Sequence, residues 1–190
     1  MKLKLLVSLC LIAAMLAMPA VALADAYPNS PPYYPAAMAL ADGEGSEFVQ
    51  PVDGLAPDAF ASINEAYEFV LNNITYVLDS ERFAEQFPGV DDVWVSANQT
   101  YYDGVGDCED KAILLCALLR FHTADPLPAD NVWVLCNRGF QHAWVQIKTD
   151  RGILTIDPTW DIIKPGGGGQ LKFNDQWVKP LSALRRGPPF

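Results

Sequence analysis

Histidine, cysteine and basic residues are scarce in this sequence. Its 190 residues include two histidines and four cysteines, so a mechanism that combines a cysteine with a histidine has few ways to be built. Only 13 lysines and arginines stand against 23 aspartates and glutamates, which gives a net charge of -10. Such a charge repels nucleic acid and anionic lipid, and it attracts cations and basic peptides. We therefore expect no nucleic-acid partner.

The apolar run at the N-terminus is too short to span a membrane. Residues 5–18 follow Lys2 and Lys4, and small residues at 22–24 come soon after, with no stop-transfer charges. This pattern is typical of a secretory signal peptide, residues 1–24. We expect a secreted, periplasmic or cell-envelope protein without a transmembrane segment. It would start near Asp25 and carry a charge of 11 − 23 = -12.

The length suits one domain of ordinary size with appendages. Residues 25–57 are rich in proline, alanine and glycine and show no apolar periodicity, which predicts a flexible linker. Residues 58–190 then form the folded domain. The four glycines at 166–169 follow no run that we expect to be a strand, and no helix that opens with Lys-Ser/Thr follows them. They therefore predict a flexible loop and no phosphate site.

One helix is expected to be buried on all sides. From residue 112 to residue 119 every side chain is apolar or a cysteine, which leaves no polar face. Gly106 and Asp107 supply a turn and an N-cap acceptor, so Cys108 belongs to the first turn. The free N–H groups there favour a thiolate and can hold an oxyanion. The alternative is that Cys108 is a small buried hydrophobic residue. The acids beside it, which must reach water or a counter-ion, favour the reactive role.

The remaining elements predict an α+β fold. A helix of about four turns, capped by Asp58, has apolar residues at helical spacing. Strand-like runs follow at 131–136, 142–149 and 152–156, joined by short turns that favour an antiparallel meander. Residues 175–181 can add an edge strand.

This meander can bring a histidine and a carboxylate to Cys108. In a strand, His142 and Trp144 face a cleft, while the residues that alternate with them face the core. Asp157 ends the next run, just before a proline. Its carboxylate can hold one imidazole nitrogen of His142 and leave the other for Cys108, an arrangement that favours a thiolate and an imidazolium.

The other histidine and cysteines have ordinary structural interpretations. His122 follows the buried helix, where a histidine commonly serves as a cap or a solvated end. An odd number of cysteines remains after residue 24, so one is unpaired in an oxidising compartment. If Cys108 is that thiol, Cys116 and Cys136 can form a bridge, although both lie in apolar settings where reduced thiols also pack.

Three ordered motifs resemble the transglutaminase-like superfamily of cysteine enzymes, in its secreted bacterial and archaeal branch. They are Gly106-Asp107-Cys108-Glu109-Asp110, His142-Ala143-Trp144-Val145 and Asp157-Pro158-Thr159. Residues 73–76 and 94–96 also resemble this branch. The resemblance implies a papain-like core with the nucleophile helix packed on an antiparallel sheet. It makes Cys108 the nucleophile, His142 the general base and acid, and Asp157 the residue that orients the histidine.

One loop departs from the pattern, because residues 97–99 stand where many relatives have Pro and Glu. The oxyanion should meet the Cys108 backbone N–H and one further donor. The Trp94 indole and the Gln99 amide are the candidates, with ordinary loop packing as the alternative for both.

The acids around Cys108 raise an electrostatic question, since nearby like charge disfavours a thiolate. Asp107, Glu109 and Asp110 are hard oxygen ligands, and a bound calcium ion would settle the conflict. Some exported relatives with the same Asp-Cys-Glu arrangement resemble calcium-dependent enzymes. The alternative is a capping role, with helix-dipole pairing and bonds to nearby strands. Beyond calcium, no cofactor is expected.

The resemblance implies an exported enzyme that acts on protein amide bonds through a thioester at Cys108. A peptidase, an amidase or a protein-glutamine acyltransferase fits, with a monomer cleaving a protein or peptide at the cell envelope favoured. One alternative is a non-catalytic surface module that binds peptides in the same cleft. Another is a peptidoglycan-cleaving peptidase of a different papain-like family, which the sequence from Asp157 to Thr159 disfavours.

Overall fold

The structure is a computed structural model that describes residues 34–35, 47–89, 92–137, 141–169, 171–176 and 178–180. The expected signal peptide, most of the expected linker and the last ten residues lie outside these ranges. Of the strand residues 34–35 and 178–180, only the backbone is described. Among the described residues, no helix is both long and apolar enough to cross a membrane.

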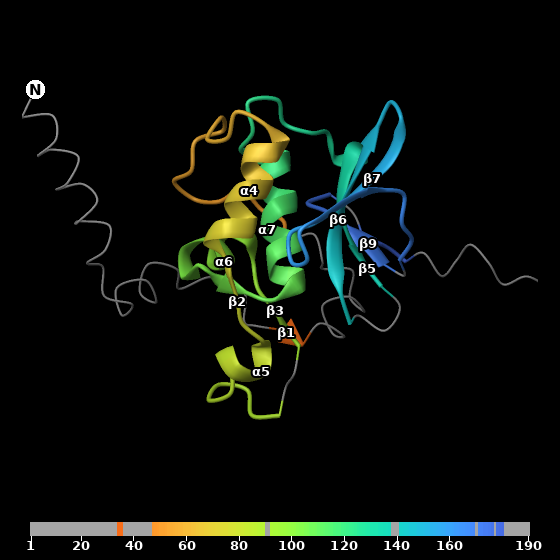
Figure 1. Ribbon diagram of the computed structural model, residues 1–190. Coiled ribbons are helices and arrows are strands. Elements are labelled where there is room, and N and C mark those ends of the chain that lie inside the picture. Colours follow the sequence, from red (N-terminus) through yellow and green to blue (C-terminus); the bar gives the residue numbers. More distant parts are fainter. Residues whose placement is uncertain are drawn as a thin grey trace, which may run out of the picture. The chain divides into compact units, whose positions relative to one another are not determined.

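A six-stranded antiparallel sheet forms one side of the domain (Figure 1). Its spatial order is β10-β9-β5-β6-β7-β8. The strands are β5 (Val132–Cys136), β6 (Ala143–Thr149), β7 (Gly152–Asp157), β8 (Ile162–Pro165), β9 (Leu171–Phe173) and β10 (Val178–Pro180). The predicted meander is β5-β6-β7, and the predicted edge strand is β10. The α+β class is thus confirmed.

Helix α7 (Cys108–Phe121) lies between this sheet and two further helices, α4 (Ile63–Asn73) and α6 (Ala97–Asp103) (Figure 1). Every residue from Cys108 to Leu119 is buried, as the uninterrupted apolar run predicts. Alternate residues of β6, namely Ala143, Val145 and Ile147, are buried in the same core. A papain-like arrangement, in which the helix that carries the cysteine packs on an antiparallel sheet, is therefore present.

Helix α4 starts later than the sequence predicts. Its N-cap is Ser62, whose Oγ accepts a hydrogen bond from the Glu65 N–H at 3.2 Å, and the predicted cap Asp58 lies outside the helix. The Glu65 carboxylate in turn accepts from the Ala61 N–H at 2.6 Å. This reciprocal pairing is close to a capping box, and it satisfies two N–H groups where Asp58 would satisfy one.

Part of the predicted linker belongs to the core, so its boundary at residue 57 is wrong. Phe48, Val49 and Val52 are each at most 2% exposed and join the main hydrophobic cluster. His122, the C-cap residue of α7, holds this segment: its Nε2 accepts from the Val52 N–H at 2.8 Å, and its Nδ1 lies 3.0 Å from the Ala56 carbonyl oxygen. His122 is therefore buried and tethers this segment to α7. The prediction that it is a solvated helix end is wrong.

Short strands position the turn before α7. Strand β2 (Thr75–Tyr76) pairs in parallel with β4 (Val105–Gly106), and β1 (Tyr34–Pro35) pairs antiparallel with β3 (Val93–Trp94). A one-turn helix, α5 (Asp79–Arg82), lies between β2 and β3 in the chain. These segments surround the N-terminal end of α7.

Replacing Gly106 with alanine is expected to lower the free energy of unfolding by about 1–3 kcal/mol. A Cβ atom at Gly106 would lie 2.6 Å from the Asp110 Cβ and 3.2 Å from the Thr100 Cγ2. Both neighbours are fully buried, so relief requires opening the α6–α7 contact. Urea unfolding followed by circular dichroism measures the change. Gly168→Ala, with no atom within 4 Å of its Cβ, is the control. Equal stability of the two variants would contradict the prediction.

The three cysteines in the described residues are free thiols. Burial raises the pKa of both Cys116 and Cys136, which keeps them protonated and unreactive. The bridge considered from the sequence is not formed in this structure.

Candidate active site

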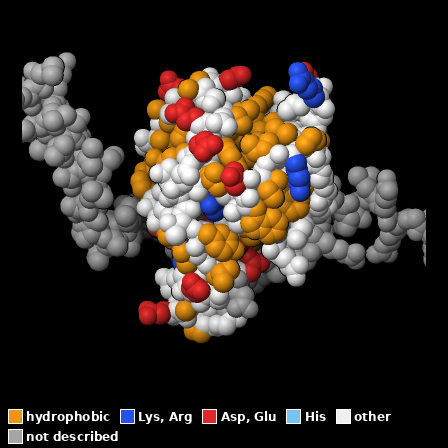
Figure 2. Space-filling view, viewed as in Figure 1, with side chains coloured by type: hydrophobic (Ala, Val, Ile, Leu, Met, Phe, Trp, Pro, Cys, Tyr) orange, Lys and Arg blue, Asp and Glu red, His pale blue; other side chains and the backbone are white. Residues whose placement is uncertain are grey.

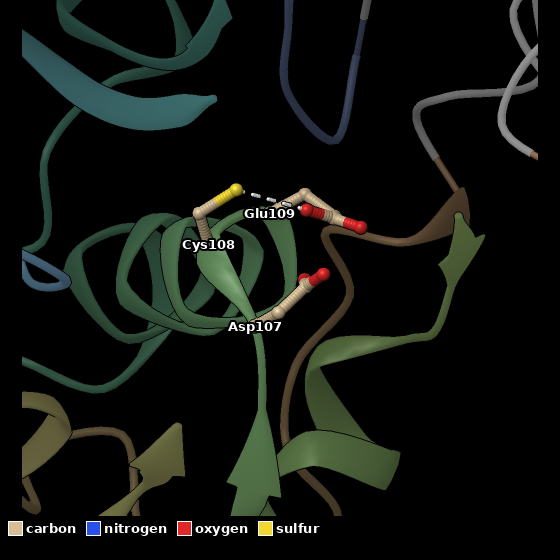
Figure 3. Close-up of side chains that lie close together, drawn as sticks. All are labelled: Asp107, Cys108 and Glu109. Carbon is tan, nitrogen blue, oxygen red and sulfur yellow. Dashed lines mark hydrogen bonds between the residues drawn. The ribbon is translucent and has the colours of Figure 1, made fainter. Parts of the chain in front are cut away.

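Cys108 is the first residue of α7, and its side chain lies beside the carboxylates of its two neighbours (Figure 3). The residue is 7% exposed. Its Sγ donates to Glu109 Oε2 at 3.2 Å, and Asp107 occupies the N-cap position. Because the first N–H groups of a helix have no intrahelical acceptor, a negative charge on the sulfur or on a bound substrate oxygen is favoured here.

His142 and Asp157 form a buried pair next to this thiol. The His142 Nε2 lies 2.6 Å from Asp157 Oδ2, and both side chains are less than a tenth exposed. The other carboxylate oxygen, Oδ1, accepts from the backbone N–H groups of Thr159 and Trp160 at 3.0 and 3.3 Å, which fixes the carboxylate. Cys108 is near enough to raise the pKa of the His142 imidazole, although the printed hydrogen bond of its sulfur goes to Glu109. The structure thus brings together the three residues that the sequence analysis selected.

The pKa of His142 is raised from 6.5 to about 9. Burial alone lowers this pKa, but the hydrogen bond to Asp157 and the interaction with Cys108 outweigh it, together with the charges of both groups. The imidazolium is therefore the stable form at neutral pH. This is the charge state that a thiolate partner requires.

Two tryptophans flank the imidazole. The Trp160 ring stacks on His142 with ring centroids 4.0 Å apart and an interplanar angle of 14°. Trp144 lies on β6 with its ring centroid 5.7 Å from that of His142. Trp144 is thus beside the histidine, as predicted from strand alternation, and its buried Nε1 has no hydrogen-bond partner. Trp160 is 63% exposed and covers the histidine from the solvent side.

The two predicted oxyanion donors are engaged with carboxylates. The Trp94 Nε1 donates to Asp92 Oδ1 at 2.9 Å, and the buried indole stacks on Phe173. The Gln99 Nε2 donates to Asp103 Oδ1 at 2.6 Å within α6. Either group must leave its carboxylate before it can reach a substrate oxygen.

Five carboxylates gather around the start of α7, and we call them the acidic cluster: Asp79, Asp92, Asp107, Glu109 and Asp110. Ligand atoms of Asp79, Asp92 and Glu109 lie within 4.8 Å of one another, and so do those of Asp79, Asp107 and Asp110. Tyr76 borders the cluster, and its phenol pKa is raised to about 12, by burial first and then by the charges of Cys108 and the acids.

The cluster holds more negative charge than its neighbours balance. Burial raises the pKa of all five carboxyls, that of Asp79 to about 7, and their mutual repulsion adds to the effect for most of them. Among the described ion pairs, the only one that brings a cation to the acidic cluster is that of Arg82 with Asp110, at 2.8 Å. Arg82 also pairs with Asp103, outside the cluster, at 2.6 Å. The buried Lys111 ammonium donates instead to the Ile74 carbonyl oxygen at 3.2 Å.

Three buried oxygens of the cluster lack any hydrogen-bond partner, namely Asp79 Oδ1, Asp107 Oδ1 and Glu109 Oε1. An unsatisfied buried carboxylate oxygen is costly unless it meets a proton or a cation. Oxygens bound to one calcium ion at roughly 2.3–2.6 Å lie within about 5 Å of each other, as these groups do. The donor set therefore fits a hard divalent cation.

A pocket of about 330 Å³ lies beside His142. Cys108 does not line it. The lining of the pocket consists of the His142–Asp157 pair, both tryptophans, Asn137, Thr155, Ile162, Lys164, Gly167 and Gly168. Figure 2 shows acidic side chains scattered over the face in view, with hydrophobic side chains gathered between them and few basic ones. Basic side chains are thus few on the face in view.

Sequence reasoning missed Trp160, Asp79 and Asp92 as site residues. Trp160 follows Asp157-Pro158-Thr159 directly, and that adjacency was the available signal. Asp79 and Asp92 come from separate segments before α6, so no local spacing could place them beside Glu109.

Residues 46–158 match the family described as the transglutaminase-like superfamily. The match covers more than half of the chain and includes Cys108, His142 and Asp157, so the chain belongs to this superfamily. No curated protein matches the chain. The superfamily is usually enzymatic and contains cysteine proteases and transglutaminases. Membership supports a cysteine enzyme that acts on amides.

Proposed function

We propose that this protein is an exported cysteine enzyme that cleaves protein or peptide amide bonds through a thioester on Cys108. The observation that carries the proposal is the buried 2.6 Å contact between His142 and Asp157 beside the thiol at the start of α7. Cysteine supplies the nucleophile, histidine transfers protons, and aspartate orients the imidazole. Water is the favoured acceptor, which makes the activity a peptidase or amidase, and an amine acceptor makes it a transglutaminase.

Each step uses groups that lie together in the site. The Cys108 thiolate attacks the amide carbon, and charge moves to the carbonyl oxygen, where N–H groups at the start of α7 stabilise it. The His142 imidazolium gives its proton to the amide nitrogen, the C–N bond breaks, and an amine leaves. Water or an amine then attacks the thioester, His142 takes its proton, and the C–S bond breaks. The thiolate and imidazolium are restored.

Mass spectrometry of the trapped acyl-enzyme tests the proposal. The purified protein is mixed with cell-envelope protein, quenched in acid and digested, and we expect an acyl adduct on the peptide that carries Cys108. The peptide that carries the buried Cys136 is the internal control and should stay unmodified. Peptide binding without any adduct would replace the proposal by the non-catalytic binding module. Added glycine amide that becomes incorporated into product would indicate transamidation.

Export is part of the same proposal and rests on the N-terminal sequence pattern. Protein recovered from the culture medium or the cell envelope should begin near Asp25, as N-terminal sequencing would show. Recovery of the intact N-terminus in the cytoplasm would contradict export. We propose a monomer that acts on a protein or peptide substrate.

We also propose that the acidic cluster binds calcium, with Asp107 and Glu109 joined by Asp79 and Asp92. The support is the set of unpartnered oxygens and the uncompensated charge of the cluster. A bound divalent cation would neutralise charge that opposes the Cys108 thiolate. Glu109, held away from the sulfur, would then leave His142 as the partner of Cys108.

Calcium at about 100 times its dissociation constant is expected to raise Tm by about 5–10 °C. Asp79→Asn should abolish this response, because the amide removes a charge from the cluster. The same variant should be at least as stable as the parent without calcium, since burial and repulsion already disfavour the Asp79 charge. Differential scanning fluorimetry with calcium and with chelator measures both effects. The exposed Asp58→Asn is the control. An unchanged calcium response in Asp79→Asn would refute the ligand assignment.

A further inference from the structure

The pocket beside His142 is donor-rich, although the protein as a whole is acidic. Lys164 is exposed and takes part in none of the ion pairs among the described residues. The Trp144 Nε1 is buried without an acceptor. The side-chain oxygen of Asn137 accepts from two backbone N–H groups, at 2.8 and 3.1 Å, so that its amide N–H groups are its remaining polar atoms. All three residues line the pocket.

Sheet register explains why these groups meet. Lys164 on β8 pairs with Thr155 on β7, and Thr155 pairs with Gln146 on β6. Directly paired residues share a face of the sheet, and Trp144 lies on the same face as Gln146, two positions away. The residues that alternate with them on β6 face α7 and the core. The cation therefore stands on the face opposite the helix, with the tryptophan nearer to His142.

The position of the pocket relative to the chemistry is set by His142 and Asp157. Both line the pocket, whereas Cys108 does not. The acyl part of a substrate must be at the sulfur, while the amine part departs with the proton that His142 delivers. A chain that leaves past the imidazole enters a pocket lined by Trp160, Trp144 and Ile162 and by the exposed Lys164, which lies two residues beyond Ile162 on β8.

We propose that this pocket binds the amine side of the substrate, and that it selects a segment with an apolar side chain followed by a carboxylate. The inference rests on the proposed function and extends it to a substrate class. The tryptophan faces accept the apolar side chain, and the Lys164 ammonium pairs with the carboxylate. An acceptor amine, if the acyl group passes to one, would occupy the same pocket.

The test uses two amidated dipeptides as product mimics, Leu-Glu-NH2 and Leu-Gln-NH2, which differ only in one side-chain carboxylate. They are titrated into the Cys108→Ala variant, so that turnover does not interfere, and binding is followed by calorimetry. We expect the Glu peptide to bind about fivefold more tightly, the size typical of an ion pair at an exposed site. Lys164→Gln should remove that preference, and Lys164→Glu should reverse it.

A matched control variant and a signal that reports where the peptide binds complete the experiment. Lys148→Gln changes an exposed lysine on β6 that does not line the pocket, and it should keep the preference. The ¹⁵N-indole signal of Trp144, assigned by loss in Trp144→Phe, should shift on binding. No preference for the Glu peptide, or a preference that survives Lys164→Gln, would overturn the inference.

The outcome can be separated from that of the proposed function. Selective binding at Lys164 together with no acyl adduct on Cys108 would support the pocket and remove the enzyme proposal. Adduct formation together with equal binding of the two peptides would support the enzyme and remove the pocket assignment.

Discussion

Replacing Cys108 with alanine is expected to abolish amide turnover, by at least about 10³-fold, while the protein stays folded. The thiol is the only nucleophile that the described residues place against the His142–Asp157 pair, so no other group can form the thioester. The fold should survive because alanine suits the first turn of α7 and the side chain lies at the edge of the core. Product release measured on the substrate identified by mass spectrometry gives the loss, and circular dichroism checks the fold.

Cys116→Ala is the matched control for this variant, because it removes a thiol from the same helix. Cys116 is fully buried, and burial raises its pKa, so it should contribute packing and no chemistry. The substitution should lower stability by roughly 1–2 kcal/mol and leave turnover per folded molecule unchanged. Turnover that persists in Cys108→Ala, or that disappears in Cys116→Ala, would sink the assignment of the nucleophile.

Replacing Asp157 with asparagine is expected to return the pKa of His142 from about 9 to about 6.5 or below. The variant loses the charge and the strong acceptor at 2.6 Å, and the burial that lowers the pKa of His142 remains. Asparagine keeps an oxygen for the Thr159 and Trp160 N–H groups, so the loop should hold. Turnover should fall by about 10²–10⁴-fold, because the imidazolium is no longer the resting form at neutral pH. The pH above which turnover declines should move to a lower value in this variant.

Nuclear magnetic resonance of labelled histidine measures this pKa directly, since the protein has two histidines and His122 provides the second signal. The raised pKa also makes a stability prediction. Protonated His142 stabilises the folded state, and this stabilisation is fully present below about pH 6.5 and is lost as the pH rises through about 9. The free energy of unfolding should therefore decline across that window. Asp157→Asn should lack this decline, and the exposed Asp150→Asn should keep it. A His142 signal that titrates alike in the parent and in Asp157→Asn would contradict the prediction.

Local sequence patterns were sufficient where burial follows from one segment alone. The uninterrupted apolar run behind Cys108, preceded by a turn and an N-cap residue, predicts a helix buried on all sides, and all of its residues from Ala112 to Leu119 are inaccessible. Strand alternation likewise placed Trp144 beside His142 and the residues between them in the core. The three motifs, in their order along the chain, were enough to identify the superfamily.

Patterns failed where two segments compete or cooperate. Asp58 is a good N-cap by composition, but Ser62 and Glu65 satisfy more N–H groups, so α4 starts four residues later. Residues 47–57 look like a linker because their apolar residues have no period. Three of those apolar residues are nevertheless buried, because His122 at the end of α7 bonds the Val52 N–H. A tether of this kind joins positions seventy residues apart and leaves no local trace.

The sequence by itself determined the helix, the thiol at its start, and the strand-like runs that bring in His142 and Asp157, because each depends on spacing within one segment. The order of the three motifs along the chain determined the superfamily. Only the tertiary structure decided what surrounds the thiol. Asp79 and Asp92 reach Glu109 because β2, β3 and α5 fold against the start of α7. Lys164 reaches the pocket beside His142 because β8 pairs with β7. Charges from separate segments meet only when packing brings the segments together, and no spacing along the chain records that.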